Sequence, residues 1–129
     1  MAIGVAENWE VVSLELDELR DLASLVIQSG FRELGYARTC VRRLSPGFEC
    51  SDAARAQYIV QARERLHTLD HAIEFYRGEV LDRWAGVLAL TDGEVDAIRE
   101  KYERESAPIR AALREGLERI GASIQQRGR

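Results

Sequence analysis

Apolar residues recur along this chain at intervals of three and four positions, the spacing that places side chains on one face of an α-helix. The first such stripe advances by about 3.6 residues per step, and its phase does not reset at the glycine in its middle. Its members are Leu19, Ala23, Val26, Gly30, Leu34, Ala37, Val41 and Leu44. The pattern therefore predicts one helix over about 14–44, with Gly30 on its inner face. The alternative is a helix that ends at Gly30, which would then act as its C-cap.

A second stripe advances by about 3.5 residues per step, which is heptad spacing and favours coiled-coil-like packing. Its members are Ile59, Ala62, Leu66, Leu69, Ile73, Tyr76, Val80, Trp84 and Val87. The pattern predicts a second helix over about 52–89. Gly78 and Gly86 are weak points within it, each costing about 1 kcal/mol relative to alanine.

The third helix is predicted from a capping box at its start. Thr91 and Glu94 have the spacing at which each side chain accepts a hydrogen bond from the backbone amide of the other residue. We therefore expect a helix over about 92–125. Pro108 lies inside it and removes one backbone hydrogen bond, so we expect a kink there or, alternatively, a break.

Three helices of similar length, joined by one short loop and one tight turn, predict an all-α fold. We expect an elongated antiparallel three-helix bundle with coiled-coil-like packing. The 129 residues form a single domain, in which residues 1–12 are an N-terminal arm and residues 126–129 a frayed tail. The alternative is a compact four-helix bundle, produced by a break at Gly30 or Pro108.

The end of the second helix is apolar on nearly all sides. Leu81, Ala85 and Leu88 lie opposite the stripe that contains Val80, Trp84 and Val87. Such a helix end is either buried on both sides within one chain or covered by a second chain. We expect the second arrangement, a homodimer whose interface is formed by Leu81, Ala85, Leu88 and Trp84.

The composition and charge of the chain argue against several classes of protein. The chain is 46% hydrophobic and 31% charged, which is too apolar for a disordered segment and too charged for a membrane protein. Its net charge of −4 disfavours a general nucleic-acid binder, because such proteins carry a positive surface. The longest apolar run, residues 84–90, is far shorter than the ~20 residues that cross a bilayer. Since residues 1–12 lack the basic start of a signal peptide, we expect a cytoplasmic protein.

Four residues of the second helix form a candidate metal site. Glu64, His67, His71 and Glu74 are spaced by three, four and three positions and share one helix face. Two histidines four residues apart can ligate one Zn²⁺ ion, and a Glu-x-x-His unit is half of a di-iron site in helical bundles. This face lies opposite the predicted core stripe. A metal site would therefore lie at the surface or in a dimer interface, and the alternative is a solvated polar face.

A hydrolytic alternative depends on Arg65 and His71. Their Arg-x5-His spacing is similar to that of the all-helical HEPN ribonucleases, and the similarity covers only these two residues. In that family a polar residue typically follows the arginine near a helix start, whereas here Leu66 follows in mid-helix.

A basic cluster closes the first predicted helix. Arg38, Arg42 and Arg43 offset the helix dipole at its C-terminal end, and they are also a candidate contact for an anion or a nucleic acid. Cys40 and Cys50 flank the following loop, and we expect two reduced thiols in a cytosolic protein.

The predicted core stripes contain almost no ionisable residues, which an active site inside the bundle would normally require. We therefore expect a non-enzymatic helical protein-interaction or assembly module that acts as a homodimer. Its acidic charge fits a small inhibitor or immunity-type binder of another protein, because it would complement a basic target. The alternatives are a metal-binding or hydrolytic helical protein that uses His67 and His71, and a helical subunit of a nucleoprotein assembly.

Overall fold

The fold is an all-helical bundle in the computed structural model, which describes the backbone of residues 2–127 and the side chains of residues 15–123. Over residues 2–127 it contains four helices and no strand. These are α1 (Ala2–Arg43), α2 (Asp52–Arg77), α3 (Glu79–Val87) and α4 (Asp92–Arg127). The all-α prediction is confirmed, whereas the count of three helices is wrong.

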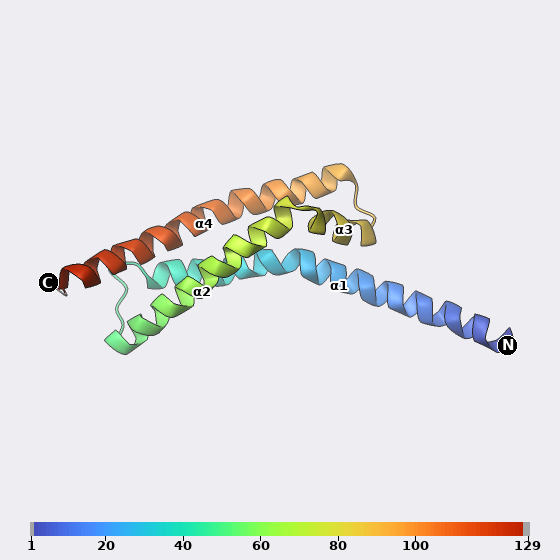
Figure 1. The fold of residues 1–129 in the computed structure, drawn as a ribbon, viewed down its shortest axis with the longest axis horizontal. Coiled ribbons are helices and arrows are strands. Elements are labelled where there is room, and N and C mark those ends of the chain that lie inside the picture. Colours follow the sequence, from blue (N-terminus) through green and yellow to red (C-terminus); the bar gives the residue numbers. More distant parts are fainter. Residues whose placement is uncertain (1, 128–129) are drawn as a thin grey trace.

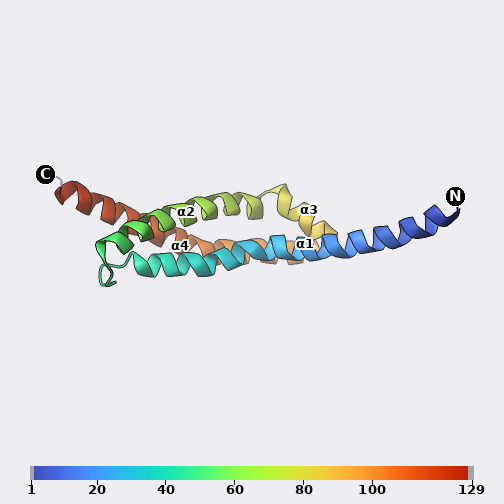
Figure 2. The ribbon, with the colours of Figure 1, turned by 90° about the horizontal axis from the view of Figure 1, so that it is seen from below.

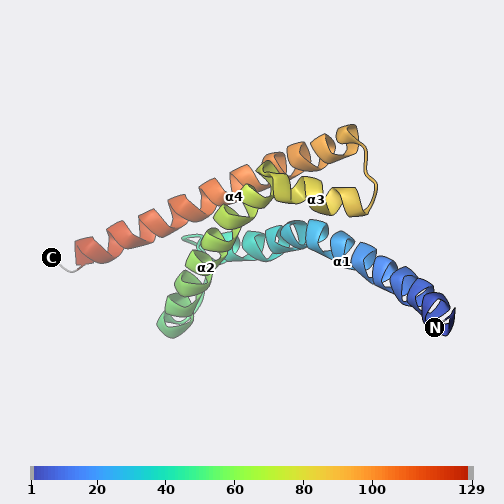
Figure 3. The same cartoon turned by 45° about the vertical axis from the view of Figure 1, so that its right-hand side comes forward.

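The bundle is built from three long helices, and α3 is a short addition to them. α1 and α4 run in the same direction and α2 runs in the opposite one, and each of the three helices packs against the other two (Figures 1 and 2). α3 lies between α1 and the first turns of α4 (Figure 3). The N-terminal turns of α1 extend well beyond the end of α3 and of the bundle (Figures 1 and 2).

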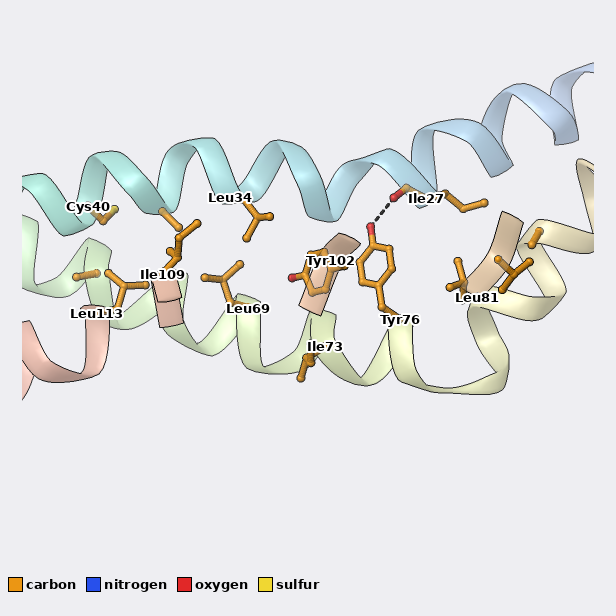
Figure 4. Close-up of a cluster of buried hydrophobic side chains, with 14 of the residues drawn as sticks. Ile27, Leu34, Cys40, Leu69, Ile73, Tyr76, Leu81, Tyr102, Ile109 and Leu113 are labelled. Atoms are coloured by element: carbon orange, nitrogen blue, oxygen red, sulfur yellow. Dashed lines mark hydrogen bonds between the residues drawn. The ribbon is translucent and has the colours of Figure 1, made fainter. Parts of the chain in front are cut away.

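The core follows the predicted stripes of α1, α2 and α4 and has an aromatic centre. The Tyr76 and Tyr102 rings are stacked, with centroids 3.9 Å apart and planes inclined by 17°. The Tyr76 hydroxyl donates a hydrogen bond to the carbonyl oxygen of Ile27 on α1 (Figure 4). A Cβ atom at Gly30 would lie 2.5 Å from the Tyr76 ring, so the predicted inward-facing glycine is the position that admits this ring. α1 is therefore continuous through Gly30.

Two helix starts are capped by side chains. Ser51 caps α2, its hydroxyl accepting a hydrogen bond from the Ala54 amide at 3.1 Å. The predicted capping box of α4 is confirmed: the Thr91 amide donates to Glu94 at 3.1 Å, and the Glu94 amide donates to Thr91 Oγ1 at 3.2 Å. α4 also continues through Pro108, so no break occurs there.

The predicted second helix breaks at Gly78, which separates α2 from α3. Gly78 has an extended backbone (φ −93°, ψ −176°). Arg99 of α4 compensates for the break, because its guanidinium donates to the carbonyl oxygens of Tyr76 at 2.8 Å and Gly78 at 3.0 Å. The same side chain forms an ion pair with Asp82 at 2.9 Å. A cation on α4 thus satisfies backbone groups that a continuous helix would have satisfied itself.

The start of the first helix also differs from the prediction. α1 begins at Ala2 instead of near residue 14, so residues 2–12 are helical. At the other end α4 extends to Arg127, and the last two residues of the predicted tail, 128–129, lie outside the described residues.

Candidate interaction surface

The break at Gly78 decides which side of α3 faces the core. Leu81 and Ala85 are buried, with exposed fractions of 0% and 1%, whereas Val80 is 45% exposed. Trp84 and Leu88 are partly buried against the core. The predicted interface of Leu81, Ala85, Leu88 and Trp84 is therefore corrected, because its two central residues already pack inside one chain. The outward side of α3 is the side of Val80.

A larger unpartnered apolar area lies on α1. Leu16, Leu19, Leu22 and Leu25 are 47%, 38%, 47% and 51% exposed. Every side chain of residues 15–22 is exposed, and the first buried side chain described in α1 is Ala23. Leucines three residues apart are each rotated by about 60° from the last, so these four follow a spiral around half of the helix. No single neighbouring helix can cover such a spiral.

Apolar grooves flank α1 where it leaves the bundle. One groove, of about 330 Å³, lies between α1 and α3. It is lined by Leu19, Val80, Arg83, Trp84 and Val87. The other, of about 480 Å³, lies beside the α3–α4 turn, and Lys101 is at its edge with Nζ 5.2 Å from the centre of the Phe31 ring. We use the name α1–α3 surface for Leu16, Leu19, Leu22, Leu25, Val80, Trp84 and Val87.

Charge is distributed unevenly along α1. Residues 2–25 contain six acidic residues and one arginine, a net charge of −5, although the whole chain carries only −4. Residues 26–43 contain four arginines and one glutamate, a net charge of +3. One helix therefore has an acidic half, which includes the turns that extend beyond the bundle, and a basic half packed within the bundle.

The four residues of the candidate metal site lie on an exposed face of α2. Glu64, His67, His71 and Glu74 are all exposed, and the two imidazole rings are 4.3 Å apart between centroids. Among the residues whose side chains are described, no group of three or more His, Cys, Asp or Glu is arranged to hold a metal ion. The structure thus brings the two histidines together but does not gather the four residues into one site.

The other two candidate sites are the Arg65–His71 pair and the basic cluster at the end of α1. Their residues either lie apart or form contacts with other side chains. Arg65 pairs with Glu33 of α1, whereas His71 is exposed on another side of α2. In the basic cluster, Arg38 and Arg42 are exposed, while Arg43 packs over the Tyr58 ring at 4.7 Å and donates a hydrogen bond to Gln61.

Both cysteines are free thiols. Cys40 is buried, and this burial raises the pKa of its thiol despite the nearby Arg65 and Arg43, which act in the opposite direction. A buried thiol with a raised pKa is a poor nucleophile.

The predicted apolar stripe of the first helix does not include Leu16, Leu22 or Leu25. A signal for them was present: four leucines at a constant spacing of three cannot all belong to one stripe of a helix with 3.6 residues per turn. That spacing marks a helix that is apolar on more than one side.

No protein-family model, curated protein or solved structure matches this chain. Within the described residues, no helix is both long enough and apolar enough to span a bilayer.

Proposed function

We propose that this protein is a non-enzymatic helical interaction module that binds another polypeptide chain through the α1–α3 surface. The observation that carries the proposal is the exposure of four leucines on a helix that extends beyond its own bundle. Single exposed apolar residues are common on proteins, but a contiguous set of large ones marks a binding surface.

The helical state of residues 2–22 supports the same proposal. Most helices in proteins gain their stability by packing an apolar face against a neighbour, rather than from the intrinsic propensity of their residues. In residues 15–22 no side chain is buried against the rest of the chain. A partner that packs against the exposed leucines would supply the missing stabilisation.

Introducing charged side chains in place of the exposed leucines tests the proposal. A Leu22→Glu, Leu25→Glu double variant should leave the core intact, because both side chains are exposed and neither belongs to the buried cluster. Val60→Glu is the matched control, since Val60 is 53% exposed on α2, away from the α1–α3 surface. Light scattering after size exclusion reports self-association of each protein, and chemical cross-linking in cell extract reports association with other chains.

We expect wild type and Val60→Glu to associate and the double variant to remain a folded monomer in both assays. Association that survives the double substitution unchanged would contradict the proposal.

A further inference from the structure

Leu22 and Leu25 of the α1–α3 surface also belong to a longer line of exposed residues on α1, and this line indicates the partner. Among the exposed residues of α1, seven are spaced by alternating intervals of three and four positions, with a mean of 3.5, which is the spacing that keeps side chains along one seam of a helix. We call this set the α1 seam: Glu15, Glu18, Leu22, Leu25, Ser29, Arg32 and Tyr36. All seven side chains are exposed, although the Arg65 guanidinium of α2 lies over the Tyr36 ring, 5.1 Å from its centre, at the C-terminal end of the seam.

The order of charges along the seam determines which helix can pair with it. Acidic residues lie at its N-terminal end, two leucines follow, and a cation lies beyond them. A helix with the opposite order of charges is complementary, and α1 read in the reverse direction has that order. An antiparallel second copy thus places the acidic half of each α1 beside the basic half of the other. A parallel pair would instead place two halves of net charge −5 side by side.

We infer that a second copy of this chain occupies the α1 seam, with the two α1 helices antiparallel and the two-fold axis between Leu22 and Leu25. This inference rests on the proposed function and specifies its partner. Leu22 of each copy packs against Leu25 of the other, and the interface is isologous. In the same register Glu15 of one copy lies beside Arg32 of the other, and the pair occurs twice.

The chain can therefore act as a homodimer whose interface lies on α1. Each bundle sits at one end of a long antiparallel helix pair, and the acidic half of α1 is ordered by the other subunit. The interface is distinct from the residues Leu81, Ala85 and Leu88, which the monomer uses for its own packing and turn.

Charge reversal along the seam tests the orientation of the pair. Glu15→Arg and Arg32→Glu each turn two attractive pairs per dimer into repulsive ones, so each variant should raise the dimer Kd by about 30-fold. The two substitutions in one chain restore opposite charges and should return the Kd to within about threefold of wild type. Both residues are exposed, and among the described residues neither forms an ion pair within the monomer, so the fold should persist.

Glu18→Arg is the matched control, since it makes the same change in net charge opposite Ser29, which has no charge. It should change the Kd by less than about threefold. Sedimentation equilibrium measures all four variants, and circular dichroism confirms their folding.

Three results would overturn the inference. In a parallel pair Glu15 faces its own copy, so Glu15→Arg would leave the Kd unchanged. A combined variant as weak as the single variants would exclude the Glu15–Arg32 register. A wild-type monomer at all concentrations would exclude the second copy; if cross-links in extract still depended on Leu22 and Leu25, the proposed function would stand with a different partner.

Discussion

The two halves of α1 belong to one continuous helix but have opposite relations to the rest of the chain. Residues 26–43 bury Leu34, Ala37 and Cys40 against α2 and α4. Residues 15–25 expose four leucines, although their sequence is no less apolar. The difference shows that an apolar stripe on a helix predicts only that the stripe packs against something. It does not indicate whether the same chain or another chain supplies the contact.

The largest expected difference in the free energy of unfolding is between alanine variants of a buried leucine and of an exposed leucine. Leu81→Ala removes a side chain that is fully buried and should lower the free energy of unfolding by about 2–5 kcal/mol. Leu25→Ala removes a half-exposed side chain and should change the free energy of unfolding of the monomer by less than about 0.5 kcal/mol.

Urea denaturation in dilute solution, where the monomer dominates, measures both variants. An equal decrease in the free energy of unfolding for the two variants would contradict the assignment of Leu81 to the core and Leu25 to the exposed surface.

Two glycines of α1 sharpen the same comparison. A methyl group at Gly30 would collide with the Tyr76 ring, which cannot move freely because it is stacked on Tyr102 and hydrogen-bonded to Ile27. Gly30→Ala should therefore cost about 1–3 kcal/mol. Gly35→Ala gives the same gain in helix propensity, and the new methyl group would lie in open space. It should therefore stabilise the protein by about 0.5–1 kcal/mol.

Thermal and urea unfolding of the two alanine variants should give changes of opposite sign. If Gly30→Ala were also stabilising, the close packing of Tyr76 on α1 would be wrong.

The smallest of these effects distinguishes the two stacked tyrosines. The Tyr76 hydroxyl has a hydrogen-bond acceptor, whereas the buried Tyr102 hydroxyl has no partner among the residues whose side chains are described. Tyr76→Phe should cost about 1 kcal/mol, and Tyr102→Phe should be neutral or slightly stabilising. Burial raises the pKa of Tyr102 to about 12, so its hydroxyl is neutral at pH 7 and the comparison is free of charge effects.

Chevron or equilibrium denaturation at pH 7 resolves differences of this size. A loss for Tyr102→Phe as large as that for Tyr76→Phe would show that both hydroxyls are paired.

The sequence predicted those features of the fold that depend on local pattern. The phase of the apolar stripe across Gly30 correctly indicated a continuous helix, and the Thr91–Glu94 capping box correctly marked the start of α4. The break at Gly78 was not predictable from its neighbours. It depends on Arg99, which satisfies the freed carbonyl groups from 21 positions further along the chain.

The candidate surface could be predicted only in part, for a related reason. The sequence showed that residues 80–88 are apolar on two sides, but the conformation of Gly78 alone decides which side faces the core. The same break transfers Leu81 to the inside and Val80 to the outside. The predicted stripe of α1 begins at Leu19; Leu16 is in phase with it one step earlier, whereas Leu22 and Leu25 lie on another side of the helix.

Amide hydrogen exchange at two protein concentrations tests the central claim most directly, because it reads the two halves of α1 separately. We predict that amides of residues 2–22 are protected at a concentration above the dimer Kd and exchange rapidly below it. Amides of residues 34–40 should keep the same protection at both concentrations. Protection of residues 2–22 that did not depend on concentration would contradict the account.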